Sequence, residues 1–257
     1  MQFPYFILAA AVLGLCLGSF YNVCIHRYLS GESIVWPGSH CPLCGHRLAW
    51  WENIPLVSFL ILRGRCRECT GSISVRYPLV EIVSGTISAL LAWKFGLTWA
   101  WAVYTFFAGL LIVASFIDFA AYILPDILTL PGAGLALAFT PLLPLPWFDA
   151  FVGAAAGFAV FWILQYGYKA IKKQEGLGGG DVKLMLLIGT LVGWKGLPLT
   201  IFLASCLGLA ASLFYLYRER NRGMQTRIPF GPFLALGAYV YILCGERIWA
   251  WYLGVTF

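Results

Sequence analysis

The sequence predicts an all-α fold: a polytopic membrane bundle of about eight transmembrane helices, with a small four-cysteine module in one polar loop. Three observations lead to this class. First, 61% of the 257 residues are hydrophobic and 11% are charged, whereas soluble domains are about half apolar and about a quarter charged. Second, aromatic residues make up 17% of the chain, as expected where two membrane–water interfaces need anchoring. Third, the apolar residues are grouped in long runs.

Crossing a bilayer as a helix takes roughly 20 apolar residues. The candidate spans are residues 5–25, 79–97, 99–117, 128–147, 150–168, 182–197, 199–217 and 229–253. The first run lacks a basic segment before it and an Ala-x-Ala site after it, so we expect a retained helix rather than a signal peptide. The count of eight is least secure at 182–197, which is short, and at 128–147, which several prolines interrupt. Leu56–Leu62 is too short to span, and we expect it against the membrane surface.

The basic residues orient this scheme. Most of the 17 lie in or beside three loops on one side of the membrane, which the positive-inside rule places in the cytoplasm, with the N-terminus outside. At the ends of the spans these residues can also meet anionic membrane lipid, so the net charge of +6 does not indicate nucleic-acid binding. On this topology Asp118 ends the third span and Asp181 begins the sixth, both at the cytoplasmic face.

Four cysteines in the first of these loops form two Cys-x-x-Cys pairs, Cys41 with Cys44 and Cys66 with Cys69. Each pair can present two thiolates, and two such pairs complete a tetrahedral, structural Zn²⁺ site. Gly45 and Gly71 follow the pairs closely, as a tight turn requires. Cytoplasmic placement disfavours disulfides. Structural zinc is therefore the favoured interpretation, while a disulfide or redox pair and unpaired thiols stay open.

An ionisable residue at membrane depth is a functional-site hypothesis by default. Asp181 follows Gly178, Gly179 and Gly180, whose backbone can adopt unusual conformations and admit another chain at close range. Taken alone, Asp118 is better explained as a cap or an ion-pair partner. Two close carboxylates, however, can share a proton: one activates water against a peptide carbonyl and the other protonates the leaving amine.

Several blocks in order resemble the type IV prepilin peptidases, the prepilin leader peptidase/N-methyltransferase family. The blocks are residues 18–23, 41–69, 76–81, 117–118, 124–131, 178–184 and 228–233. The resemblance implies that Asp118 and Asp181 are the two catalytic aspartates, similar to those of presenilin-type Gly-x-Gly-Asp proteases. Asp118 corresponds to the first of the two catalytic aspartates because it lies seven residues before Pro125-Asp126. Asp126 itself is expected to be a helix N-cap.

The resemblance also implies a substrate class and a second activity. Prepilins and pseudopilins would be cut after a Gly at the cytoplasmic face of the bacterial inner membrane, and S-adenosylmethionine would methylate the new N-terminal residue. The substrate leaders are basic, so Glu52, Glu81 and Glu175 are candidate partners, with structural pairing to nearby arginines an equally good explanation. Pro125, Asp126 and Lys183 are further candidate supporting residues. No glycine-rich fingerprint places the methyl donor.

These features predict three regions: a first transmembrane helix (1–28), a methyltransferase-associated four-cysteine loop (29–77) and a transmembrane aspartyl peptidase core (78–257). Two other functions fit parts of the pattern. An ion- or proton-coupled transporter would use the two acids as carriers. A zinc-bearing secretion scaffold would have no catalytic activity.

Overall fold

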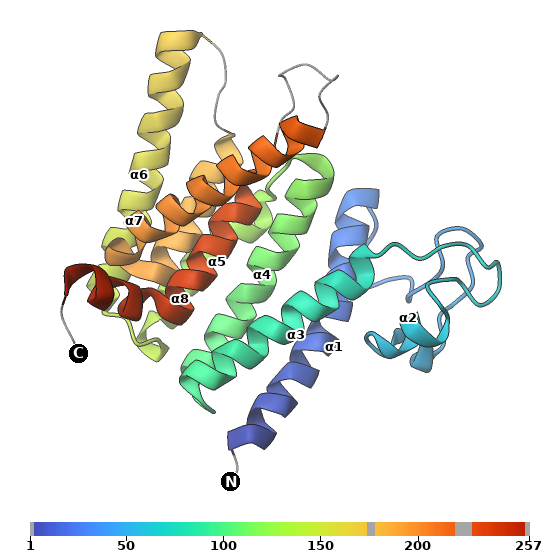
Figure 1. Cartoon of the computed structure of the whole chain (residues 1–257). Coiled ribbons are helices and arrows are strands. Elements are labelled where there is room, and N and C mark those ends of the chain that lie inside the picture. The colour runs from blue at the N-terminus through green and yellow to red at the C-terminus, as the bar shows by residue number, and fades with distance from the viewer. Residues whose placement is uncertain (1–2, 174–177, 219–227, 255–257) are drawn as a thin grey trace. The chain divides into compact units, whose positions relative to one another are not determined.

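The computed structural model describes residues 3–173, 178–218 and 228–254 (Figure 1). Apart from two isolated β-bridges, every regular element in these ranges is helical. In chain order the elements are α1 (Phe3–Ser30), η1 (Trp50–Asn53), α2 (Val57–Ile61), α3 (Arg76–Phe95), α4 (Trp99–Ala121), α5 (Asp126–Phe139), η2 (Thr140–Leu142), α6 (Trp147–Lys172), α7 (Gly179–Arg218) and α8 (Gly231–Leu253). The chain divides into two compact units, residues 1–113 and 114–257, which are described in turn.

Six of the described helices are long and apolar enough to cross a membrane: α1, α3, α4, α6, α7 and α8. The proline-interrupted run corresponds to a shorter apolar helix, Asp126–Leu142. The two predicted spans 182–197 and 199–217 are joined in α7, which has 40 residues. The eight predicted apolar segments thus fall on seven helices. The predicted all-α membrane fold is confirmed, with six membrane-capable helices among the described residues where the sequence predicts about eight. Leu56–Leu62 contains the five-residue helix α2.

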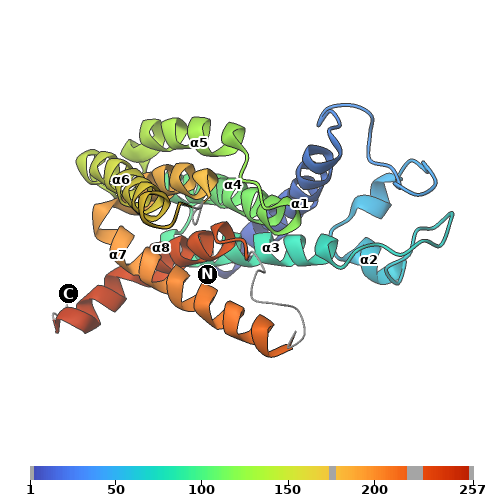
Figure 2. The ribbon, with the colours of Figure 1, turned by 90° about the horizontal axis from the view of Figure 1, so that it is seen from above.

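The break inside α7 differs from the prediction. The sequence places it at Pro198, but the non-helical residue is Gly193, with φ 67° and ψ 172°. Pro198 lies inside the second part of α7, five residues after Gly193, where it removes one helical hydrogen bond without ending the helix. Glycine adopts positive φ at no steric cost. The kink therefore forms at Gly193 and turns the second part of α7 away from the first (Figures 1 and 2).

In the first unit, α1 packs closely against α3. A Cβ atom on Gly14 would lie 2.7 Å from the carbonyl oxygen of Ser84, and one on Gly18 would lie 2.7 Å from the Cα atom of Glu81. Such small residues let membrane helices approach each other. The buried Asn22 side chain donates to the carbonyl oxygen of Tyr77 at 2.9 Å. The long loop between α1 and α3 is thus anchored at both of its ends.

In the second unit, α7 packs against α5, α6 and α8. Gly153 of α6 meets Gly189 of α7 so closely that a Cβ atom on either one would collide with the other's backbone. Figure 2 shows α6 beside the first part of α7. This packing fixes the part of α7 that carries Asp181.

Candidate active site

The two predicted catalytic acids lie at helix ends in the second unit. Asp118 is in the last turn of α4 and Asp181 is in the first turn of α7. Only 5% of Asp118 and 9% of Asp181 is exposed. The two carboxyl groups interact electrostatically across the gap between these helices. The structure therefore brings together the pair that the sequence predicts.

A third helix contributes a donor to this pair. The backbone N–H of Gly231, the first residue of α8, donates to Asp118 Oδ2 at 3.1 Å. A Cβ atom on Gly231 would lie 2.8 Å from the same oxygen, so only glycine lets the backbone come this close. The sequence alone did not predict a role for Gly231. The feature of the sequence that could have indicated this role is the Gly-Pro pair at the start of α8. Such a pair marks the start of a helix, where the N–H groups have no partner within the helix and can bond to a carboxylate.

Leu124 packs against two glycines near the acids, Gly231 and Gly180. A Cβ atom on Gly231 would meet Leu124 Cδ2 at 3.2 Å, and one on Gly180 would meet Leu124 Cβ at 2.8 Å. The glycines before Asp181 thus have different surroundings. Gly180 is pressed against Leu124, whereas Gly178 and Gly179 are exposed. Gly178 O accepts the Asp181 N–H at 3.1 Å, and the two exposed glycines have no side chain to keep another chain away.

Asp126 and Lys183 pair with each other beside the acids. Lys183 Nζ lies 2.8 Å from Asp126 Oδ1 and 2.7 Å from Oδ2, which joins α5 to α7. The expected N-cap role of Asp126 is wrong. Pro125 occupies the N-cap position without a side-chain bond, and Asp126 is the first helical residue. Its negative charge still suits a helix N-terminus.

Glu52 and Glu81 lie in the first unit and bond to backbone N–H groups. Ala49 N–H donates to Glu52 Oε2 at 2.7 Å, and His46 Nε2 lies 3.2 Å from the same oxygen. The Ala49 N–H, together with His46, holds the pKa of the Glu52 carboxyl below its ordinary value. Leu56 N–H donates to Glu81 Oε2 at 2.9 Å. Both carboxylates therefore support the fold of the cysteine loop, and Glu175 lies outside the described residues.

The four predicted metal ligands form a cluster. The sulfur atoms of Cys41, Cys44, Cys66 and Cys69 all lie within 4.8 Å of one another. Cys41 Sγ is 3.9 Å from Cys69 Sγ, and Cys44 Sγ is 3.9 Å from Cys66 Sγ, so neither pair is a disulfide. Tetrahedral zinc with Zn–S bonds of about 2.3 Å places its sulfur atoms about 3.8 Å apart. The cluster thus has the dimensions of a metal site with four thiolate ligands.

The two cysteine turns have the same hydrogen-bond pattern. Gly45 N–H donates to Cys41 O at 2.9 Å, and Thr70 N–H donates to Cys66 O at 3.0 Å. Gly45 and Thr70 both have positive φ, 72° and 55°. The left-handed residue of the second turn is thus Thr70, and not Gly71 as expected. A Cβ atom on Gly71 would meet Leu43 Cδ1, the movable end of an exposed side chain, and would lie 3.3 Å from Cys69 Sγ.

Known families match both parts of the chain. The bacterial peptidase A24 N-terminal domain matches residues 12–95, and the type IV leader peptidase family matches residues 105–213. A prepilin leader peptidase/N-methyltransferase of Pseudomonas putida is 39% identical over an alignment of 275 positions, gaps included, that covers 97% of this chain and 94% of the relative. The chain belongs to the type IV leader peptidase family. With six membrane-capable helices, it is a multi-pass membrane protein.

Other members of the type IV leader peptidase family carry the same name. The protein of Myxococcus xanthus is 43% identical over 87% of this chain and 67% of its own length. The protein of Neisseria gonorrhoeae is 34% identical over 96% of this chain and 93% of its own length. No solved structure gave a significant match. The family relationship supports neither of the two alternative functions, the transporter and the non-catalytic scaffold.

Proposed function

We propose that this protein is a membrane-embedded aspartyl endopeptidase that removes the leaders of type IV prepilins and pseudopilins and then methylates the new N-terminal amine. The observation that carries the peptidase assignment is the buried pair of Asp118 and Asp181 in a chain of the type IV leader peptidase family. The relatives named above are prepilin leader peptidase/N-methyltransferases.

Backbone groups stabilise both acids of the pair. The Gly231 N–H donates to Asp118 Oδ2, and the Gly178 backbone stabilises the Asp181 carboxylate, so either acid can be the ionised member. The ionised acid takes a proton from water as the water oxygen attacks the scissile carbonyl carbon. The other acid holds the proton that the pair shares, polarises the carbonyl and protonates the leaving amine. Proton exchange between the two acids then restores the starting state.

The substrate would approach along the exposed backbone of Gly178 and Gly179. These residues precede Asp181, and neither has a side chain to hold a peptide away. The ion pair of Asp126 and Lys183 is a positioning contact, because it ties the start of α7 to α5. Glu52 and Glu81 would act on the substrate only indirectly, through the cysteine loop that they support.

The basic residues support cytoplasmic cleavage at the bacterial inner membrane. Lys169 and Lys172 lie in the last turn of α6, next along the chain to the loop before Asp181. The positive-inside rule then places the acid pair at the cytoplasmic face and the N-terminus outside. The predicted cytoplasmic loop that carries Arg220, Arg222 and Arg227 lies outside the described residues.

The four-cysteine cluster is proposed to hold a structural zinc ion. Four thiolates close a tetrahedral site and leave no position for substrate, so the ion would stabilise residues 29–77 rather than catalyse. These residues form the proposed methyltransferase-associated region, between the first helix (1–28) and the peptidase core (78–257).

When bound, S-adenosylmethionine supplies a methyl group that is attached to its sulfonium sulfur. When an amine attacks the methyl carbon, the bond from carbon to sulfur breaks and the rest of the donor leaves as a neutral thioether. The freed amine of the cut pilin is the matching nucleophile.

Cleavage of a purified prepilin in detergent tests the peptidase assignment. The wild-type protein is expected to cut, whereas Asp118→Asn and Asp181→Asn are expected to lose cleavage. Asp149→Asn is the matched control, since Asp149 is another helix-terminal acid of the second unit and pairs with Lys195 at 3.4 Å. Wild-type cleavage by either Asp118→Asn or Asp181→Asn would refute the assignment.

A further inference from the structure

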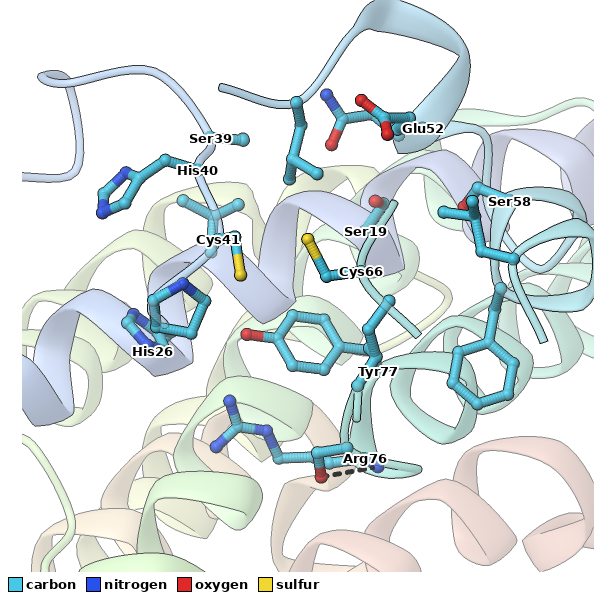
Figure 3. A pocket seen from close by; sticks show the side chains of 18 of the residues that line it. Ser19, His26, Ser39, His40, Cys41, Glu52, Ser58, Cys66, Arg76 and Tyr77 are labelled. Carbon is cyan, nitrogen blue, oxygen red and sulfur yellow. Dashed lines mark hydrogen bonds between the residues drawn. The ribbon is translucent and has the colours of Figure 1, made fainter. Parts of the chain in front are cut away.

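The first unit contains a cavity of about 550 Å³. Its walls come from the end of α1, the segment 31–75 that we call the four-cysteine segment, and the start of α3. Figure 3 shows this arrangement, with Ser19 and His26 from α1 and Arg76 and Tyr77 from α3 around the cysteines. Small-molecule sites in proteins occupy about 300–1,000 Å³. The cavity is thus large enough for a nucleoside-sized ligand.

The cavity combines apolar walls with charged groups of both signs. Phe59 and Tyr77 supply aromatic rings, and Cys41 and Cys66 also line the cavity. Arg76 places its guanidinium 5.3 Å from the centre of the Tyr77 ring. Such a lining suits a ligand that has an aromatic part and charges of both signs.

Two charged residues that line this cavity have buried atoms without partners. Glu52 Oε1 and Arg76 Nε are both inaccessible and make no hydrogen bond to any described residue. Buried polar atoms are nearly always paired, so each such atom calls for an explanation, for example an ion, a water or a ligand. The other oxygen of Glu52 already accepts the Ala49 N–H. One acid and one base with spare bonding capacity therefore border the same space.

We propose that this cavity binds S-adenosylmethionine. The inference rests on the proposed methyltransferase function and adds a location to it. Arg76 matches the carboxylate of the methyl donor, and Glu52 matches its hydroxyl or ammonium donors. The rings of Phe59 and Tyr77 match its adenine and its sulfonium cation. The basic leader of a prepilin fits less well, because Arg27, Arg67 and Arg76 offset the three glutamates that line the same cavity, Glu32, Glu52 and Glu81.

Filling the cavity tests this proposal without relying on activity. Ser58 lines the cavity from α2, whereas Leu60 of the same helix is 73% exposed and does not line it. We compare Ser58→Trp with Leu60→Trp by equilibrium dialysis of S-adenosylmethionine against purified protein in detergent. Ser58→Trp is expected to bind at least ten-fold more weakly, a loss of about 1.4 kcal/mol, and Leu60→Trp is expected to bind as the wild type does. Equal affinity in both variants would overturn the proposal.

Two further measurements guard against misfolding of the Ser58 variant. Glu52→Gln keeps an acceptor for the Ala49 N–H but loses the charge, and it is expected to weaken binding by roughly ten-fold. Ultraviolet cross-linking of methyl-labelled S-adenosylmethionine to the wild-type protein is expected to label peptides within residues 19–81. Label found only within residues 114–257 would contradict the proposal.

The experiments distinguish a wrong functional assignment from a wrong location of the S-adenosylmethionine site. Prepilin cleavage is measured on the same preparation. A wild-type protein that cleaves prepilin and binds S-adenosylmethionine, but carries the label only in the second unit, refutes the location alone. A wild-type protein that never binds the donor refutes both the location and the methyltransferase activity. Absence of cleavage by the wild type refutes the peptidase activity.

Discussion

Replacing Gly231 by alanine is expected to slow prepilin cleavage by about 10- to 100-fold while the protein stays folded. The added Cβ atom would lie 2.8 Å from Asp118 Oδ2, and ordinary contact begins at about 3.4 Å. The carboxylate must therefore move by about 0.6 Å, and a displacement of about 1 Å in a catalytic group can cost roughly 100-fold in rate. Alanine keeps the N–H donor, so the substitution tests the position of Asp118 rather than the presence of its hydrogen bond.

The assay is kcat/KM for a purified prepilin in detergent, with Gly167→Ala as the matched control. Gly167 lies in α6, and a Cβ atom there would meet nothing within 4 Å. Gly231 does not have positive φ, so alanine introduces no backbone strain at this position. Gly167→Ala is expected to retain wild-type kcat/KM. Wild-type kcat/KM in Gly231→Ala would refute the idea that α8 positions the Asp118 carboxylate.

Three more predictions concern the surroundings of the site. Cys41→Ser is expected to lose the metal that mass spectrometry finds in the wild type. Cys206→Ser is expected to keep the metal, because Cys206 is outside the cluster. An undiminished metal content in Cys41→Ser would exclude the four-thiolate site. Lys183→Gln breaks a partly exposed ion pair with Asp126, so thermal unfolding should show a loss of at most about 1 kcal/mol, and a much larger loss would contradict the surface character of this pair. The pKa of the Glu52 carboxyl is lower in the folded state than in the unfolded state. Ionised Glu52 therefore stabilises the folded protein above its unfolded pKa of about 4.3, and this stabilisation is lost as the pH falls through its pKa in the folded state. The melting temperature of the wild type should therefore fall more steeply than that of Glu52→Gln on acidification below about pH 5, and parallel curves would contradict this role.

The sequence was sufficient to predict the helices and the pairing of the acids, because both predictions depend on the lengths and spacing of residue types along the chain. Apolar length predicted the membrane segments. Alternation of the eight expected spans predicts that Asp118 and Asp181 share a membrane face, and the family resemblance implies that they are a pair. Cys-x-x-Cys spacing likewise predicted a cluster whose sulfur atoms lie within 4.8 Å of one another. In each case the spacing of residue types determines the geometry.

Contacts between distant residues could not be predicted in this way. Gly231 lies 113 residues from Asp118, and no periodicity connects its N–H to that carboxylate. The expectation that Glu52 and Glu81 pair with arginines or bind a leader overlooked backbone donors, which any turn can present. The kink at Gly193 depended on which of two helix-breaking residues could fit inside the helix. All three depend on the packed structure.

The most direct test of the acid pair is a double-mutant cycle on prepilin cleavage. Single-turnover rates are measured for the wild type, Asp118→Asn, Asp181→Asn and the double variant. Groups that act as one catalytic unit are strongly non-additive, so either single substitution is expected to slow cleavage as much as the double substitution does. Two partial losses that multiply in the double variant would show that the carboxyl groups act independently and would contradict the shared-proton mechanism.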